Sequence, residues 1–383
     1  MELRTLEQHI AILATMPEAS APVISCYLNL QGGAPGYQDA WDERIGALRK
    51  CLTGTERRDF EEGLIPIQKF LQAGTPEGAA SLAMFARAGE RPFFLALHFR
   101  VPLPTWIAVG PTPNIYHLVE IKDNYDRYVV LLATEESARI LAINLGSVTQ
   151  EIWKMRPDLR RRVGHEWTKE HFQSHRQERI HQFIHEQIRI LDRLMSAGGY
   201  GHFILAGSVR ITSAIRKALP KHLAKKLVDI VPAASNGRAE DVVAATIGAF
   251  LEHEERESVS MVDQLLSRIH TNGLAVAGTD GCMRALGAGQ ADVLLVAKSY
   301  QPGEGWECRK CRETRIEAQR PAACPKCHSA RLRVFDGKEE MVRMAERLGC
   351  QVEVVEHSDA LERLGGVGCL LRFLAPAQQG RAA

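Results

Sequence analysis

Four cysteines in the last quarter of the chain have a spacing that predicts metal binding. They form two Cys-x2-Cys pairs separated by twelve residues: Cys308, Cys311, Cys324 and Cys327. Two intervening residues let both thiolates of a pair reach one metal ion from a tight turn, and two such turns complete a tetrahedral site. We therefore predict a structural zinc ion in a ribbon over residues 303–335. Four thiolates leave no position for water, so this zinc would stabilise structure and perform no catalysis.

Disulfide bonds and a redox-active pair are the two alternatives for these cysteines. The N-terminal residues do not resemble a secretory signal peptide, and no apolar run approaches the length of a membrane span, so we expect a reducing, cytoplasmic location. A redox pair would not need a second Cys-x2-Cys unit. The other cysteines stand singly, and we expect buried, inert thiols there: Cys26, Cys51, Cys282, Cys350 and Cys369.

A basic and histidine-rich segment from Lys154 to Arg189 is the second candidate site. Its nine Lys and Arg residues against five Asp and Glu residues leave a local charge of +4, whereas the whole chain carries +2. Cations pair with phosphates, and Trp153 and Trp167 offer ring faces to bases. The alternative is a solvated, charged helix face. The predicted RNA contacts are Arg160, Arg161, Arg162, His165, Lys169, His175, Arg176 and Arg179.

Histidines in the same segment raise the question of a second metal site. Four of them form two pairs with a spacing of four residues: His171 with His175, and His181 with His185. On a helix this spacing can place two ligands on one face. No His-Glu-x-x-His motif occurs, so a hydrolytic metal centre is not predicted. A further basic cluster is interpreted as a solubilising helix surface: Lys221, Lys225 and Lys226.

The length and the order of apolar patterns predict three α/β domains in a chain of 383 residues. We expect an N-terminal domain over residues 1–123, a middle domain over 124–254 and a C-terminal domain over 255–383. The middle domain should contain the basic segment and a long helix. The zinc ribbon should be an insertion in the C-terminal domain, because helix and strand patterns resume after it.

Hydrophobic periodicity predicts the main elements of each domain. A strand at Val23–Leu30 should precede helices and two further strands in the first domain. In the middle domain short apolar runs predict an antiparallel meander, and Gln173–Met195 has the three- and four-residue spacing of a helix with one buried face. Two separate helices are expected at Asp241–Leu251 and Ser260–His270. The C-terminal domain should resume after the ribbon with a helix at Lys338–Leu348.

Three stretches carry a resemblance to a known family. The helix-to-strand sequence at Arg284–Leu295 and the Gly-Gly-Val-Gly turn into a strand at Gly365–Phe373 resemble the last domain of archaeo-eukaryotic class one peptide release factors and of their relative Pelota. The tyrosine-led run at Asp126–Leu141 resembles the middle domain of bacterial members, in the branch exemplified by Balon. This resemblance implies a three-domain release-factor-like architecture, and it implies binding to ribosomal RNA in the A-site region. It also implies a translational GTPase such as elongation factor Tu as a possible partner, and no membrane or DNA partner.

The chain departs from the family at both functional loops. Release factors carry a Gly-Gly-Gln loop in the middle domain, whereas the matching stretch here has Gly164 and Gln173 separated by eight residues. Without paired glycines the backbone is not expected to reach the conformations that this loop needs. The Asn-Ile-Lys-Ser motif that reads stop codons is also missing from the first domain.

We therefore predict a ribosome-binding factor that is not an enzyme and that acts in ribosome hibernation or in rescue of stalled ribosomes. One alternative is an enzyme: a peptidyl-tRNA hydrolase that uses Gln173, or a ribonuclease that uses histidines of the basic segment as general acid and base. Another alternative is a protein that binds structured RNA outside translation.

Overall fold

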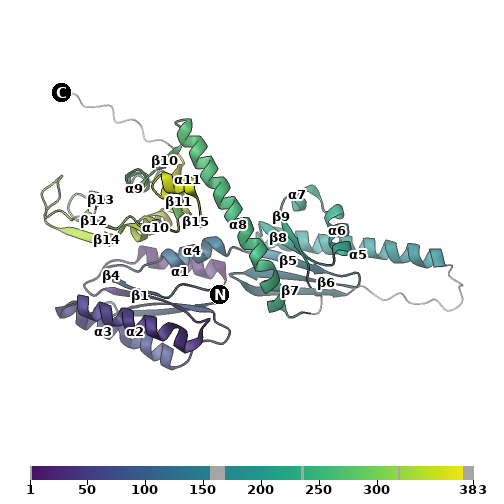
Figure 1. Ribbon diagram of the computed structural model, residues 1–383, viewed down its shortest axis with the longest axis horizontal. Coiled ribbons are helices and arrows are strands. Elements are labelled where there is room, and N and C mark those ends of the chain that lie inside the picture. Colours follow the sequence, from purple (N-terminus) through teal and green to yellow (C-terminus); the bar gives the residue numbers. More distant parts are fainter. Residues whose placement is uncertain (1, 156–168, 234–236, 318–319, 374–383) are drawn as a thin grey trace. The chain divides into compact units, whose positions relative to one another are not determined.

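The computed structural model describes residues 2–155, 169–233, 237–317 and 320–373 (Figure 1). Within these residues the chain forms a mixed α/β fold with four β-sheets. Contacts divide it into two compact units, Met1–Leu3 with Tyr125–Glu254 and Arg4–Asn124 with Glu255–Ala383. The mixed α/β class with several domains is thus confirmed, while the exact domain boundaries stay predictions. Among the described helices, none has the length and apolar character needed to cross a bilayer.

The middle unit is built on a five-stranded sheet with the strand order β7-β6-β5-β8-β9. The first three strands in sequence are antiparallel neighbours, as the predicted meander requires. The last two strands extend the sheet in parallel to β5. The strands are β5 (Tyr128–Ala133), β6 (Ser137–Asn144), β7 (Ser147–Met155), β8 (His202–Gly207) and β9 (Leu227–Val231).

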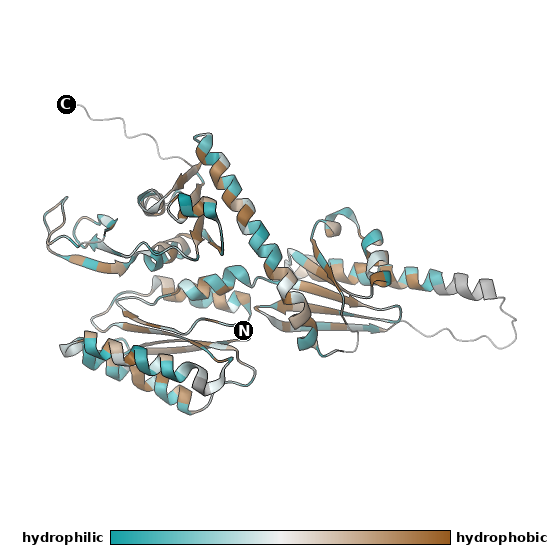
Figure 2. Ribbon diagram, in the orientation of Figure 1, coloured by the Kyte–Doolittle hydropathy of each residue, from teal (hydrophilic) through white to brown (hydrophobic). Residues whose placement is uncertain are grey.

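Helices cover both faces of this sheet because alternate residues of a strand point to opposite sides. Val129 and Leu131 of β5 pack in one core with Leu191 of α5. Val130, between them, packs in a second core with Phe250 of α8. The central strands β5 and β8 are accordingly apolar on both faces (Figure 2). The helices are α5 (Lys169–Gly198), α6 (Val209–Ala218), α7 (Lys221–Ala224) and α8 (Ala239–His270).

The helix predictions for this part of the chain have different outcomes. The long helix expected at Gln173–Met195 is confirmed as α5. The prediction of two separate helices at Asp241–Leu251 and Ser260–His270 is wrong, because α8 is one continuous helix of 32 residues. The polar stretch between them interrupts the apolar pattern but contains no Pro or Gly that would end a helix.

The first 124 residues carry a four-stranded antiparallel sheet with the order β3-β2-β1-β4. Ile24, Cys26 and Leu28 of β1 point toward α2 and α3. Tyr27 points to the other face, where its ring meets His117 of α4 and its hydroxyl donates to the Asn114 carbonyl over 2.6 Å. The elements are α1 (Leu3–Thr15), β1 (Val23–Asn29), α2 (Gly33–Cys51), α3 (Gly54–Gln72), β2 (Ser81–Arg87), β3 (Phe93–Phe99), β4 (Trp106–Gly110) and α4 (Tyr116–Asn124).

The C-terminal sheet has the order β10-β16-β11-β15. β11 is parallel to β15 and antiparallel to β16. Leu265 of α8 packs directly on Gly368 of β16, where an added Cβ atom would lie 2.4 Å from the leucine Cδ2 atom, so this close approach requires glycine. The elements are β10 (Ala275–Ala277), α9 (Thr279–Gly287), β11 (Ala291–Ala297), α10 (Gly337–Leu348), β15 (Gln351–Val355), α11 (Asp359–Arg363) and β16 (Val367–Leu371).

A buried carboxylate joins the N-terminal sheet layer to the C-terminal layer within their common unit. Glu339 of α10 accepts hydrogen bonds from the backbone N–H groups of Ile115 at 2.8 Å and Tyr116 at 3.2 Å, at the start of α4. The first N–H groups of a helix lack intrahelical acceptors and carry partial positive charge. Glu339 therefore caps a helix that begins 223 residues earlier in the chain.

Polar contacts on either side of this cap reinforce the same interface. Lys122 of α4 pairs with Glu346 of α10. The Asp123 carboxylate accepts a hydrogen bond from the backbone N–H of Val354 in β15 at 2.6 Å. The cap and these contacts fix α4 against both α10 and β15.

The Glu339 cap predicts a pH-dependent stability of this unit. Burial raises the pKa of Glu339 from 4.5 to about 8, so the folded state favours the protonated form. Its contribution to stability is therefore complete below about pH 4.5 and is lost as the pH rises through about 8. Burial lowers the pKa of the neighbouring Lys338 from 10.5 to about 8. The stability that depends on Lys338 therefore increases as the pH rises from about 8 to 10.5, above the range in which Glu339 titrates.

We expect wild-type protein to lose stability relative to a Glu339→Gln variant as the pH rises from about 4.5 to 8. The measurement is the thermal unfolding midpoint of both proteins across this range. Glu90→Gln, which changes an exposed glutamate between β2 and β3, serves as the control and should follow the wild type. A wild-type-minus-Glu339→Gln difference that stays constant with pH would contradict the raised pKa of Glu339.

Candidate metal centre

The four cysteines lie in a small three-stranded antiparallel sheet with the order β13-β12-β14. Its strands are β12 (Glu304–Cys308), β13 (Thr314–Ile316) and β14 (Leu332–Asp336). Cys308 is the last residue of β12, and Cys311 lies in the turn that follows. The ribbon begins and ends at adjacent positions, because the backbone N–H of Gly337 donates to the Gly303 carbonyl at 2.9 Å.

Both Cys-x2-Cys pairs adopt the same turn geometry. The N–H of Arg312 donates to the Cys308 carbonyl at 2.8 Å, and the N–H of His328 donates to the Cys324 carbonyl at 2.8 Å. The residue after each second cysteine has a positive φ, 61° at Arg312 and 55° at His328. The two turns therefore close identically and point their thiols toward a common centre.

The sulfur atoms are arranged as a four-thiolate metal site requires. All four lie within 4.8 Å of one another. The Sγ atoms of Cys308 and Cys327 are 3.5 Å apart, as are those of Cys311 and Cys324. A tetrahedral ion with metal–sulfur bonds of about 2.3 Å places its sulfurs about 3.8 Å apart. The residues present thus fit a tetrahedral metal ion.

Main-chain hydrogen bonds favour a deprotonated thiol at Cys308. Cys308 and Cys324 are fully buried and pack with Trp306 and Leu332. Backbone hydrogen bonds from Cys311 and then Lys310 lower the pKa of the Cys308 thiol to about 6. The thiolate is the form that binds metal, so the turn prepares its first ligand through main-chain groups.

Arg333 of β14 anchors the ribbon to the rest of its unit. Its guanidinium is only 5% exposed and donates to Glu307 of β12 at 3.0 Å and to Glu340 of α10 at 2.7 Å. It also pairs with Glu18, in the segment after α1. Three carboxylates from three parts of the chain therefore surround one buried cation, which would be costly to bury without them.

The single cysteines are mostly placed as predicted. Cys26, Cys282, Cys350 and Cys369 are buried free thiols. Cys51 is exposed, so the expectation of burial is wrong for this residue. It is the last residue of α2.

Most of the predicted RNA contacts cannot be placed by their side chains. Arg160, Arg161, Arg162 and His165 lie outside the described residues. Lys169, His175 and Arg176 belong to α5, but only their helical backbone is described. Arg179 is exposed on α5. Of the histidine pairs, His181 and His185 are exposed with their Nε2 atoms 3.3 Å apart.

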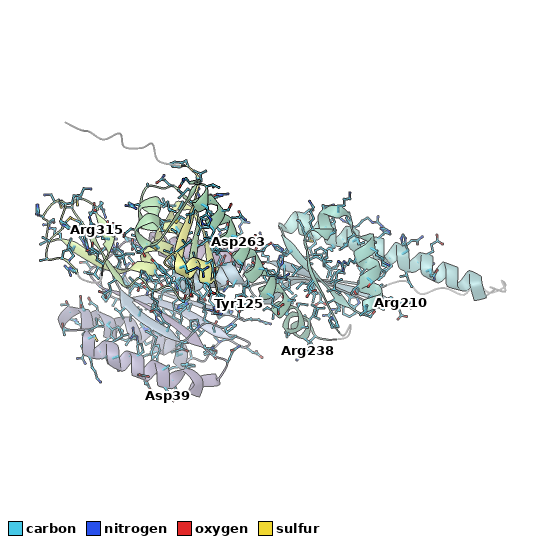
Figure 3. All side chains as sticks on the ribbon, turned by 45° about the horizontal axis from the view of Figure 1, so that its top comes forward. Asp39, Tyr125, Arg210, Arg238, Asp263 and Arg315 are labelled. Atoms are coloured by element: carbon cyan, nitrogen blue, oxygen red, sulfur yellow. The ribbon has the colours of Figure 1, made fainter. Side chains whose placement is uncertain are left out.

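A basic surface lies next to α5. It includes Lys221 and Lys225, which were predicted from the sequence only to make a helix surface soluble. The stretch 209–226, which includes α6 and α7, carries six Lys and Arg residues and no Asp or Glu. α7 contacts α5 through His222, whose Nε2 atom lies 3.0 Å from Asp192 Oδ1. Arg210, labelled in Figure 3, is 77% exposed. Among the described side chains, the exposed cations of α5, α6, α7 and the residue after α7 are Arg179, Arg189, Arg193, Arg210, Arg216, Lys217, Lys221 and Lys225.

Two family profiles match adjacent parts of the chain. Residues 113–251 match the family described as bacterial archaeo-eukaryotic release factor family 10. Residues 256–375, which include the four cysteines, match domain 3 of eRF1. Both matches agree with the resemblance found in the sequence, which they confirm.

Curated relatives come from archaea. The peptide chain release factor subunit 1 of Pyrococcus abyssi is 28% identical over 176 residues, or 40% of this chain and 42% of that protein. The protein pelota homolog of Pyrococcus furiosus is 23% identical over 280 residues, or 67% of this chain and 66% of that protein. The chain thus spans about two-fifths to two-thirds of the curated relatives it matches.

Solved structures of similar proteins include archaeal aRF1, at 16% identity with a TM-score of 0.28 over 97% of this chain and 99% of that chain. They also include Dom34 of S. cerevisiae, at 11% identity with a TM-score of 0.39 over 78% of this chain and 82% of that chain. A ribosome-bound archaeal Pelota matches at 16% identity with a TM-score of 0.39, over 76% of this chain and 77% of that chain.

Replacing Cys311 with serine should abolish metal binding and unfold the ribbon. The ribbon core consists of few apolar residues besides the cysteines, so the ion must supply most of the order. Elemental analysis of freshly purified wild type should give roughly one equivalent of metal per chain. Hydrogen exchange of β12 and β14 should accelerate in Cys311→Ser, while the five-stranded sheet of the middle unit should stay protected.

Cys51→Ser is the matched control, because it removes an exposed thiol far from the ribbon in sequence. It should keep both the metal and the protection of β12 and β14. Retention of the metal in Cys311→Ser, or a protected ribbon in metal-free wild type, would refute the assignment.

Proposed function

The chain is a bacterial archaeo-eukaryotic release-factor and Pelota-like protein, and from this premise we propose that it binds the ribosome in the A-site region without releasing the nascent peptide. The observation that carries the proposal is the exposed basic surface of α5, α6 and α7. It lies within the stretch that matches the bacterial release-factor family. Ribosomal RNA is the phosphate-rich partner that this surface fits.

The charge distribution supports an RNA partner over a merely soluble surface. Six cations without an acid in residues 209–226 give a local density far above that of the chain, whose net charge is +2. Such a patch attracts a polyanion and gains affinity through release of its counterions. Arg179 and Arg189, at the end of the basic segment, belong to α5, which α7 contacts through His222 and Asp192.

The sequence of the middle unit supports a role without hydrolysis. The region that matches the family's catalytic loop contains Gly164 and Gln173 but no Gly-Gly pair. The loop mechanism depends on backbone conformations that glycine adopts readily and other residues do not. We therefore propose that the chain occupies ribosomes and leaves peptidyl-tRNA intact.

The physiological settings we propose are hibernation of idle ribosomes and rescue of stalled ones. A solved relative, Dom34, is described as a translation termination-like factor involved in RNA quality control and interacting with Hbs1. The family resemblance implies a translational GTPase, and we propose such a protein as the partner of this chain on the ribosome.

Zinc is the metal we propose for the four-cysteine site. Four thiolates in a tetrahedral arrangement suit zinc or iron, and zinc needs no change of oxidation state to hold structure. With all four positions taken by sulfur, the ion would order the ribbon and its attachment to α10. Elemental analysis distinguishes the two metals.

Ribosome binding should depend on the basic surface of α6 and α7. A Lys217→Gln/Lys221→Gln variant should bind ribosomes several-fold more weakly, and the slope of log affinity against log salt should fall by about 1–2. Both side chains are exposed, so the fold should persist. The measurement is cosedimentation with ribosomes from growing and from starved cells at several salt concentrations.

The matched control, Lys50→Gln/Lys69→Gln, removes two exposed lysines of α2 and α3. It should bind as the wild type does. Absence of the wild type from ribosomal fractions in both growth states would reject the proposal. Crosslinking that then recovers another structured RNA would favour an RNA-binding role outside translation.

Peptide release provides the test of the non-enzymatic role. Stalled ribosomes with labelled peptidyl-tRNA should retain their peptide when incubated with the purified protein, and Gln173→Ala should behave like the wild type. A release factor of known activity on the same complexes is the positive control. Peptide release or RNA cleavage that disappears in Gln173→Ala or His175→Ala would establish an enzyme instead.

A further inference from the structure

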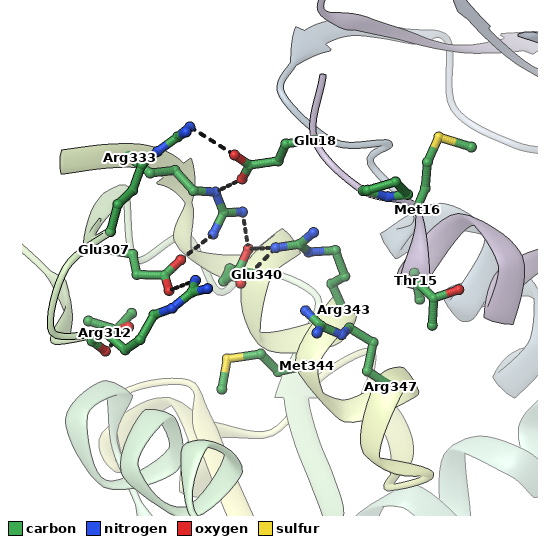
Figure 4. Close-up of a pocket in the computed structure, with 14 residues that line it drawn as sticks. Thr15, Met16, Glu18, Glu307, Arg312, Arg333, Glu340, Arg343, Met344 and Arg347 are labelled. Atoms are coloured by element: carbon green, nitrogen blue, oxygen red, sulfur yellow. Dashed lines mark hydrogen bonds and ion pairs between the residues drawn. The ribbon is translucent and has the colours of Figure 1, made fainter. Parts of the chain in front are cut away.

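A cavity of about 630 Å³ lies beside the ribbon, within one unit of the structure (Figure 4). Three parts of the chain line it: the end of α1 with the segment that follows, the strands and first turn of the ribbon, and α10. Its volume is within the range of cavities that bind small molecules. The basic surface of the middle unit does not involve it.

Arginine dominates the charged lining of this cavity. Five guanidinium groups face three carboxylates, an excess of two positive charges. The lining arginines are Arg309, Arg312, Arg333, Arg343 and Arg347, and the glutamates are Glu18, Glu307 and Glu340.

Each of the three carboxylates is shared between two arginines. Glu18 pairs with Arg309 at 2.9 Å and with Arg333. Glu307 pairs with Arg312 at 2.8 Å and with Arg333 at 3.0 Å. Glu340 pairs with Arg333 at 2.7 Å and with Arg343 at 2.6 Å. The carboxylates therefore do not neutralise the five arginines.

The two arginines of α10 differ in how far they are paired. Arg343 donates to Glu340 through Nη2, but its Nε atom is buried and has no hydrogen-bond acceptor among the described residues. Arg347 lies one helical turn further on, is exposed, and forms no ion pair within the part of the chain that the structure describes. Residues four apart on a helix share one face, so both side chains can address the same ligand.

The remaining lining fits phosphate groups better than a base. Hydroxyls of Thr15 and Thr314 and the side chains of Met16 and Met344 complete the wall, and no aromatic residue belongs to it. A site that recognises a base commonly stacks it on an aromatic ring. Guanidinium groups, in contrast, bind phosphate oxygens in a bidentate fashion.

We propose that this cavity binds a small anionic ligand that carries two or more phosphate groups. The ligand offsets the excess of two positive charges in the lining and pairs with Arg347, which forms no ion pair among the described residues. Glu18 limits affinity, because its carboxylate occupies two of the arginines from the opposite wall. The site is independent of ribosome binding by the middle unit.

The test is isothermal titration calorimetry on the full-length, metal-loaded protein with inorganic pyrophosphate, ADP and inorganic phosphate. Pyrophosphate and ADP should bind, and single phosphate should bind at least about tenfold more weakly. Equal affinities for pyrophosphate and ADP would identify bare phosphate groups as the ligand. Tighter binding of ADP would identify a nucleotide, and either result supports the proposal.

Two substitutions should change the affinity in opposite directions. Arg347→Gln should weaken pyrophosphate binding about tenfold, because it removes one charge-assisted contact. Glu18→Gln should tighten it, while Arg333 keeps its pairs with Glu307 and Glu340. Arg363→Gln, an exposed arginine on α11, is the matched control and should bind as the wild type does.

Metal content and thermal unfolding of each variant establish that it is folded, and Arg347 is exposed enough for its loss to spare the fold. The proposal is overturned if neither pyrophosphate nor ADP binds at millimolar concentration, or if Arg347→Gln binds them with wild-type affinity. It is also overturned if single-stranded RNA binds more tightly than pyrophosphate with the same dependence on Arg347, which would make the cavity part of a nucleic-acid surface. Loss of ribosome cosedimentation would leave these measurements unaffected.

Discussion

The buried guanidinium of Arg333 is the interaction on which the architecture around the ribbon depends. It draws one carboxylate from the segment after α1, one from the ribbon itself and one from α10. Burying this cation would be costly without carboxylate partners, so the three ion pairs together attach the ribbon to α10 and to the segment after α1. The ribbon thereby becomes part of the unit and not an independent appendage.

The second constraint on this unit is the polar interface between α4 and the C-terminal layer. The Glu339 carboxyl group accepts hydrogen bonds from main-chain N–H groups at the start of α4, whereas Arg333 pairs with carboxylate side chains. The two contacts therefore respond differently to pH. Protonation affects the first, as the raised pKa of Glu339 shows. The second keeps its charge over the physiological range, because arginine does not deprotonate in proteins.

Local patterns could be predicted from the sequence, and long-range pairings could not. The turns around Cys308 and Cys324 depend on residues within a few positions of each other, so their spacing was sufficient to predict the cluster. Helix α5 was predicted because its apolar face repeats along the chain. The contact between Glu18 and Arg333 joins distant segments through polar groups, and no periodicity reveals such a pair. The edge strand β10 is too short, at three residues, to leave a hydrophobic pattern.

The ends of the ribbon meet through the hydrogen bond from Gly337 to Gly303. The two ends of the insertion are therefore adjacent. Strands β11 and β15 can pair directly although the ribbon lies between them in the sequence. While the cysteines are unliganded, joining these strands must confine a long flexible stretch, which carries an entropic penalty that grows slowly with length. Metal binding orders most of that stretch before the two strands pair. The supply of metal during synthesis would then determine the order of folding. The ribbon would fold first, and the parallel pairing of β11 with β15 would follow.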